Sequence, residues 1–239
     1  GQHCLHEEPP MSTHLTAVSD PDELARIYSE LLEPSFPADE LGSLEALQAD
    51  LGDPGSLVLT LRDDEGLDLA VSIAFHDAGA GVLLLAYLAV RPGTRGGGYG
   101  NALMAGSLQR WDEIFSPDFV IGEVERPGDR ADVVEEHGDP EARLRFYRRF
   151  GARRVVAPFF QPGIAPARHR IPMYLMLLHI SPSARVGEEV DGHLSVSAPP
   201  LRAFIADYIA ATEERPPTDP EAVELLDALG GDTVDTVPL

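Results

Sequence analysis

The stretch that decides the fold runs from Val82 to Met104 and reads VLLLAYLAVRPGTRGGGYGNALM. Its first nine residues are apolar on both faces, which is typical of a strand in the middle of a sheet. A glycine-rich turn follows, and apolar residues at helical spacing then predict a helix from Gly98 to Phe115. The next apolar run, Phe119–Val124, predicts a second strand. A strand, a turn, a helix and a strand in this order form a crossover unit, so we expect the two strands to be parallel.

The glycine-rich turn has the features of an anion-binding site. Glycines let consecutive backbone N–H groups point to one side, and the helix adds its own unpaired N–H groups and the positive end of its dipole. A nucleotide-hydrolase loop would need Lys-Ser or Lys-Thr after the last glycine, where Asn101-Ala102 stands, and the spacing of a dinucleotide fingerprint is absent. The turn therefore predicts a site for a pyrophosphate of another kind.

The flanking sequence predicts a mixed α/β fold. Upstream we expect a strand at 14–18, a helix from Asp20-Pro21 that ends before Pro34, a second helix over 39–51, and a hairpin of strands 57–62 and 67–75. Downstream we expect an exposed loop over 128–138, a helix over 139–150, and strands 153–157 and 171–180.

The length of 239 residues indicates one main core with an appendage. Residues 1–10 are interpreted as a leader before Met11, and 11–180 as the main domain. Residues 181–200 are rich in Gly, Ser and Pro and predict a linker, although 194–197 could be an edge strand. Residues 201–239 predict an acidic C-terminal helical extension with helices over 201–211 and 220–229.

Charge limits the classes of partner. Eighteen Lys and Arg against 40 Asp and Glu give a net charge of −22, which disfavours nucleic acid and membrane surfaces and favours cationic partners. The single cysteine, Cys4, cannot form an internal disulfide. The longest clean apolar run is nine residues, well short of the ~20 of a membrane helix, and no secretory signal is visible. We therefore predict a cytoplasmic protein.

The charges are also distributed unevenly along the chain. Residues 142–180 hold eight arginines and no acid, whereas 199–239 hold nine acids and two arginines. Such a basic strip is positioned for an anion or for the chain's own acidic extension. Three roles for the extension stay open: it packs on the arginine strip, covers an acceptor site, or mediates a homodimer.

The run V-x-P-x-x-R-G-x-G-x-G-x-A-L-M, from Val90 to Met104, resembles the acetyl-CoA-binding motif of the GNAT superfamily of N-acetyltransferases. A second segment, ARLRFYRRFGA at 142–152, resembles the helix of that family that carries a tyrosine four residues before a glycine. The resemblance covers roughly residues 15–180. It implies a mostly antiparallel mixed sheet with one splayed parallel strand pair, flanked by helices, to which the C-terminal helical extension is added.

The resemblance also implies the cofactor contacts. The backbone of Leu88, Ala89 and Val90 would pair with the pantetheine arm of acetyl-CoA and polarise its thioester carbonyl. The pyrophosphate would be held by the amides of the turn, namely Arg95, Gly96, Gly97, Gly98, Tyr99, Gly100 and Asn101. No metal is expected, because the later histidines lack ligand spacing and His3, Cys4 and His6 lie on an unstructured terminus.

Candidate catalytic residues come from two of these segments. In I-G-E-V-E, Glu123 resembles the glutamate that acts as base in ribosomal-protein alanine N-acetyltransferases. Glu125 projects from the same face of a strand, so it could substitute as base or clamp an ammonium, and the two carboxylates should raise each other's pKa. Tyr147 is the candidate acid for the leaving thiolate.

The acceptor site is predicted at the junction of the first two helices. The segment Phe36-Pro37-Ala38-Asp39-Glu40, with Glu33 nearby, resembles one that often lines the acceptor site in this family. The same residues would also suit a plain helix–turn–helix with Asp39 as the N-cap. We therefore predict acetyl transfer by direct attack of a primary amine of a cationic acceptor, a small molecule or a peptide. The alternative is a non-catalytic acyl-CoA-binding sensor or scaffold, which the lack of an acid on strand 82–90 favours.

Overall fold

The computed structural model describes residues 12–94, 96–128, 138–164 and 169–239. Within these ranges, eleven strands form one mixed sheet. Its main path runs β1-β2-β3-β4-β5-β8-β6-β11-β10-β9, and β7 pairs with β8 beside this path. The predicted mixed α/β class, mostly antiparallel with a parallel pair, is confirmed.

The first four strands form an antiparallel meander. They are β1 (Thr13–Ala17), β2 (Ser56–Asp63), β3 (Asp68–Asp77) and β4 (Val82–Val90). Between β1 and β2 lie α1 (Pro21–Ile27), the π-helix η1 (Tyr28–Leu32) and α2 (Leu44–Asp50). The second helix begins later than the predicted residue 39, because Ser43 caps it by accepting a hydrogen bond from the amide of Ala46.

The parallel pair lies at the centre of the sheet. Strand β4, helix α3 (Tyr99–Phe115) and strand β5 (Phe119–Glu125) form the predicted crossover unit. The β4–β5 ladder joins Val82–Leu85 to Phe119–Gly122 and then stops, although both strands continue. Next to this point the pairing of β4 with β3 skips Ala86, which forms a bulge. The two strands therefore part beyond Leu85 and Gly122, which agrees with the splayed parallel pair that the family resemblance implied.

The second half of the chain continues the sheet from β5. Helix α5 (Pro140–Arg148) begins where predicted, with Asp139 as its cap and a proline in its first turn. Strand β8 (Ile171–Ile180) pairs with the whole length of β5 through its residues Met173–Ile180. The short strands β6 (Arg153–Val155) and β7 (Phe160–Gln161) pair with β8 as well.

The prediction of a linker over 181–200 is wrong. This segment forms the 3-10 turn η3 (Pro182–Ala184) and the hairpin of β9 (Arg185–Val190) and β10 (His193–Ser197). Its glycines serve the hairpin: Gly187 and Gly192 both have positive φ, at 78° and 84°. Helices α6 (Pro199–Glu213) and α7 (Pro220–Ala228) follow, and β11 (Thr233–Pro238) then inserts between β6 and β10. The extension is therefore helical only in part.

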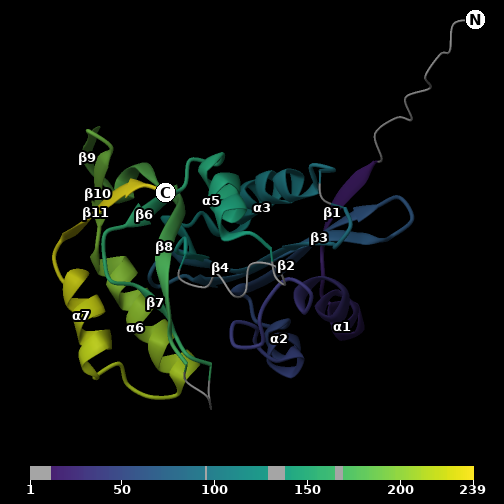
Figure 1. Cartoon of the computed structure of the whole chain (residues 1–239), viewed down its shortest axis with the longest axis horizontal. Helices are drawn as coiled ribbons and strands as arrows, with labels where there is room; N and C mark the ends of the chain where they lie inside the picture. Colours follow the sequence, from purple (N-terminus) through teal and green to yellow (C-terminus); the bar gives the residue numbers. More distant parts are fainter. Residues whose placement is uncertain (1–11, 95, 129–137, 165–168) are drawn as a thin grey trace, which may run out of the picture.

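Helices cover both faces of the sheet (Figure 1). Helices α3 and α5 pack on one face through Met104, Trp111 and Leu144. On the opposite face, α1, η1 and α2 cover β2 to β4, while α6 and α7 cover the half of the sheet that begins at β4. Within the described ranges, no helix combines the length and the apolar character needed to cross a membrane.

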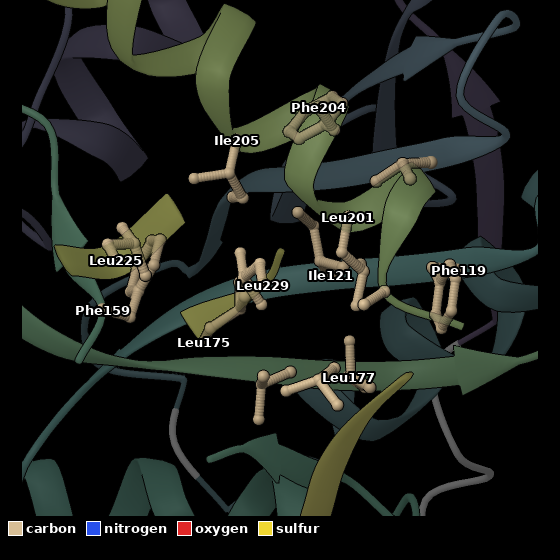
Figure 2. Close-up of a cluster of buried hydrophobic side chains, with 14 of the residues drawn as sticks. Phe119, Ile121, Phe159, Leu175, Leu177, Leu201, Phe204, Ile205, Leu225 and Leu229 are labelled. Carbon is tan, nitrogen blue, oxygen red and sulfur yellow. The ribbon is translucent and has the colours of Figure 1, made fainter. Parts of the chain in front are cut away.

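The C-terminal extension belongs to the main core. Figure 2 shows Leu201, Phe204 and Ile205 of α6, and Leu225 of α7, packed around residues of the central strands such as Ile121. Leu201, Ile205 and Leu225 are completely buried. The division into a domain over 11–180 and a separate extension over 201–239 is therefore wrong for the described residues, because both parts bury their apolar side chains in one cluster.

Candidate active site

Two connected hollows lie where β4 and β5 part. The outer groove has a volume of about 610 Å³ and follows the glycine-rich turn and the start of α3. The inner cavity, of about 70 Å³, lies between the ends of β4 and β5. Five residues line both hollows, namely Ser35, Phe36, Leu88, Arg143 and Tyr147. A ligand in the groove can therefore reach the inner cavity.

Most of the predicted cofactor contacts line the outer groove. They are Leu88, Ala89, Val90, Gly96, Gly98, Tyr99, Gly100 and Asn101. Gly97 is not among the lining residues. A Cβ there would stand 2.7 Å from the Tyr99 ring. Arg95 lies outside the described residues.

The turn has the backbone geometry of an anion cradle. Gly98 precedes α3 with φ at +75°, a left-handed conformation that favours glycine, and no side chain caps the helix there. A Cβ on Gly100 would stand 3.3 Å from Cγ2 of Val90 and 3.4 Å from Cε2 of Phe146. The first turn of α3 holds no acidic residue. Gly98, Tyr99, Gly100 and Asn101 line the groove, so the positive end of the helix dipole lies at the groove wall.

Three carboxylates line the inner cavity. Glu123 and Glu125 come from the end of β5 that has parted from β4 but stays paired with β8, on one face of the strand as predicted, and Glu40 comes from the connection between η1 and α2. Phe36 and Pro37 line the same cavity. The structure does not bring Glu33 to either hollow, and its side chain is exposed.

Glu123 has the environment of a general base. The Tyr208 hydroxyl donates a hydrogen bond of 2.7 Å to its Oε1, while Oε2 is buried with no hydrogen-bond partner of normal geometry among the described residues. Burial raises the pKa of Glu123 from 4.5 to about 7, and the side chains of Tyr208 and Gln161 oppose part of the rise. The cause is thus burial, and the expectation that Glu125 raises this pKa is wrong.

Glu125 has a cationic partner instead. Nη1 of Arg143, on α5, lies 3.4 Å from its Oε1, and the Glu125 side chain is 11% exposed. Arg143 lines both hollows. The partner that the described residues give Glu125 is therefore a guanidinium, whereas Glu123 accepts from a tyrosine hydroxyl.

Tyr147 lies on α5, at the boundary of the groove and the cavity. Burial raises the pKa of its phenol to about 12, against a smaller opposing effect of Arg143. The hydroxyl therefore keeps its proton at neutral pH and can donate it. Tyr147 comes from α5, which covers one face of the sheet, and Glu123 comes from strand β5 within the sheet; both line the cavity where β5 parts from β4.

Glu40 belongs to the segment 36–40 that the sequence analysis placed at the acceptor site. Three other residues of the site escaped that analysis: Tyr87, Gln161 and Tyr208. Tyr87 accepts a hydrogen bond of 2.9 Å from the amide of Gly42, and burial raises its pKa to about 12. Tyr208 lies in the extension that the sequence placed outside the main domain. Tyr208 follows Leu201 by seven residues, which places it on the apolar face of α6. This helical spacing is the sequence signal that could have predicted its burial.

The acidic extension packs on the arginine strip, the first of the three roles considered. Arg170 donates two hydrogen bonds to Glu213, of 2.7 and 2.9 Å, and two more to Asp219, of 2.6 and 2.9 Å. Glu213 is fully buried and also accepts from the amide of Gly163 at 3.0 Å. This cluster fixes the end of α6 to the segment that leads into β8.

Two sequence expectations remain, the absence of a metal site and the exposed loop over 128–138. His3, Cys4 and His6 lie outside the described residues, as does most of the 128–138 loop. Among the residues that the structure describes, no group of three or more His, Cys, Asp or Glu side chains is arranged to hold a metal ion.

Comparison with known proteins places this geometry in a fold family. No protein-family model and no curated protein sequence matches the chain. Solved structures do match. One from Bacteroides thetaiotaomicron, assigned to the GNAT family of acetyltransferases, is 24% identical over 72% of this chain and 89% of that one, with a TM-score of 0.55.

Two further structures agree with the first. One from Acinetobacter baylyi, assigned as an acetyltransferase, is 13% identical over 72% of this chain and 95% of that one, with a TM-score of 0.53. The ribosomal-protein-S18-alanine N-acetyltransferase from Escherichia coli is 14% identical over 75% and 99%, with a TM-score of 0.50. Together with the parted parallel strands, these matches show that the chain has the fold of the GNAT superfamily of N-acetyltransferases.

Proposed function

We propose that the chain is an acetyl-CoA-dependent N-acetyltransferase that acts on a primary amine of a cationic acceptor. The observation that carries this proposal is the position of Glu123. It is a buried carboxyl with a pKa of about 7, placed where a groove suited to coenzyme A meets an acid-lined cavity. A general base works best when its pKa lies near the operating pH.

The groove fits coenzyme A by shape and by chemistry. Its volume of about 610 Å³ lies in the usual range for cofactor sites. The amides of Gly96 to Asn101 and the start of α3 would hold the diphosphate. The edge of β4 that no longer pairs with β5, from Leu88 to Val90, would offer backbone groups to the pantetheine arm. Side chains at Gly98 or Gly100 would strain or narrow this path.

Bound acetyl-CoA supplies an acetyl thioester, whose carbon–sulfur bond breaks as the amine nitrogen bonds to the acetyl carbon. An alkylamine with a pKa of ~10 is almost fully protonated at neutral pH, so the site has to remove a proton. Oε2 of Glu123 takes this proton, since Oε1 already accepts from Tyr208. The Tyr147 hydroxyl donates a proton to the departing sulfur, and the phenolate left behind takes the second N–H proton as the nitrogen becomes an amide, so that an amide, a free thiol and a neutral Tyr147 result.

The cavity supports a cationic acceptor. Glu40, Glu123 and Glu125 line it against a single arginine, Arg143, and the net charge of the chain is −22. An ammonium group is attracted by such an excess of carboxylates, whereas a carboxylate next to the amine would be repelled. Phe36 and Pro37 supply an apolar wall for the carbon chain of the acceptor.

The test is release of the free thiol of coenzyme A by the full chain across a panel of amines. We expect turnover with cationic amines or peptide N-termini and little with amines that carry an adjacent carboxylate. Glu123→Gln and Tyr147→Phe should each lower kcat by about a hundredfold or more. Glu65→Gln, in the exposed turn between β2 and β3, and Tyr174→Phe, on β8, are the matched controls and should leave kcat unchanged.

The same experiment separates the enzyme from a non-catalytic acyl-CoA-binding sensor or scaffold. Calorimetry that shows coenzyme A binding, with no acetyl transfer to any amine in the panel, would favour the sensor. Undiminished turnover in both Glu123→Gln and Tyr147→Phe would remove the two assigned roles.

A further inference from the structure

The C-terminal extension touches the candidate active site at one polar contact. The Tyr208 hydroxyl, on α6, lies 2.7 Å from Oε1 of Glu123, although 85 residues separate the two in sequence. Tyr208 does not line the inner cavity but stands behind the carboxyl. From this geometry we infer that Tyr208 is a positioning residue, which occupies one carboxylate oxygen of Glu123 and leaves the other to accept the proton. The inference rests on the proposed function.

Tyr208 can act only as a donor in this contact. Burial and the neighbouring Glu123 keep the pKa of its phenol well above the ordinary value of 10, so the hydroxyl stays protonated. Its one proton is committed to Oε1. Oε2 of Glu123 is buried and has no hydrogen-bond partner of normal geometry in the described part of the chain. The contact thus distinguishes two oxygens that are equivalent in a free carboxylate.

The position of Tyr208 is fixed on both sides along α6. Its ring stacks on Phe204 at 6.1 Å, one turn earlier, and Phe204 is buried in the core cluster shown in Figure 2. Five residues later, Glu213 is held by Arg170 and by the amide of Gly163. Arg170 in turn stacks over the ring of Phe160, next to Gln161 of the cavity wall. A tyrosine anchored in this way can hold a side chain to one rotamer.

The other polar groups around Glu123 determine how its pKa should change when the Tyr208 hydroxyl is removed. They come from β4, β5, α5, β7 and the connection after η1, and they are Tyr87, Glu125, Arg143, Tyr147, Gln161 and Glu40. Arg143 is the only cation in this set, and it pairs with Glu125. Gln161 is the other group in this set that stabilises the charged form of Glu123, and it stays in place in the variant. Removal of the Tyr208 hydrogen bond should therefore raise the pKa of Glu123, because one of two stabilising contacts is lost.

The test is Tyr208→Phe in the full chain, with Tyr174→Phe as the matched control. Phenylalanine keeps the ring and its stacking on Phe204 but loses the donor. We expect the acid limb of the pH profile of kcat/KM to move up by about one unit, so that kcat/KM falls about fivefold at pH 7, approaches a tenfold fall at lower pH and recovers in alkali. The control should leave the profile in place.

A second measurement does not depend on turnover. Titration of the Glu123 carboxyl carbon by NMR, in protein labelled at glutamate and with the signal assigned by its loss in Glu123→Gln, should show the same upward shift in Tyr208→Phe. An unchanged carboxyl titration together with an unchanged acid limb would overturn the inference. If the unmodified chain acetylates no amine, the proposed function fails, and the carboxyl titration still decides the role of Tyr208.

Discussion

Glu123→Gln should make the folded chain more stable at neutral and alkaline pH while it removes activity. Burial raises the pKa of Glu123 from 4.5 to about 7 in the folded state. Between these two values the folded chain holds a proton that the unfolded chain has released, so the free energy of unfolding falls as the pH rises. The shift of 2.5 units corresponds to about 3 kcal/mol, lost between about pH 4.5 and pH 7.

The assay is urea unfolding of both proteins at a series of pH values from 4.5 to 8. Because the chain has 40 acidic residues, the useful quantity is the difference between the two proteins at each pH. Glutamine is neutral and can still accept the hydrogen bond from Tyr208, so the two curves should nearly coincide at pH 4.5. By pH 8 the variant should be about 3 kcal/mol more stable.

The control separates this effect from a general change of charge. Glu65→Gln removes one carboxylate from the exposed β2–β3 turn and should give a difference that does not vary with pH. The claim that burial raises the pKa of Glu123 would be refuted by either of two results. The stability difference between Glu123→Gln and the unmodified chain could be zero at every pH, or the variant could lose stability relative to the unmodified chain as the pH rises. Glu123→Gln and the unmodified chain should bind coenzyme A with the same affinity.

Two further predictions concern the core and the groove. Leu225→Ala should lower the stability by about 2–5 kcal/mol in thermal or urea unfolding, because Leu225 is completely buried, whereas Val190→Ala, 64% exposed, should change it by less than about 0.5 kcal/mol. A melting curve that does not distinguish the two would mean that α7 is separable from the core. Gly100→Val should weaken coenzyme A binding about tenfold or more in calorimetry, about 1.4 kcal/mol, since even a Cβ would lie 3.3 Å from Val90. Gly52→Val is its control, with no atom within 4 Å, and equal affinities would place the ligand elsewhere.

The segment from Val82 to Phe115 was predictable because its signals are local. Nine apolar residues, a cluster of glycines and a helical spacing fix the strand, the turn and the helix within about thirty residues of chain. The capped start of α5 at Asp139-Pro140 is local in the same sense. Glu123 and Glu125 share a face simply because side chains alternate along a strand.

The C-terminal part was not predictable in this way, because its role depends on long-range pairing. Strand β11 has only six residues, and its partners β6 and β10 lie far from it in sequence. The glycines of 181–200 are equally compatible with a linker and with a hairpin, and only the register of β9 on β10 decides between them. Similarly, no spacing rule connects Tyr208 to Glu123, since the contact requires α6 to cross the parted strands.

This long-range contact changes what the fold can do chemically. With an ordinary pKa of 4.5, a glutamate would accept a proton from an alkylammonium of pKa ~10 against about 7 kcal/mol, whereas a pKa of about 7 lowers this cost to about 4 kcal/mol. The difference depends on the exclusion of water from Glu123, and α6 contributes to it by packing across β5 with Leu201, Phe204 and Ile205. Tyr208 moves the pKa in the opposite direction, because it stabilises the carboxylate. The extension therefore acts on the pKa of Glu123 in two opposite directions. Burial by α6 raises the pKa and strengthens the base, and the hydrogen bond from Tyr208 lowers it, so that the carboxyl is still ionised near neutral pH.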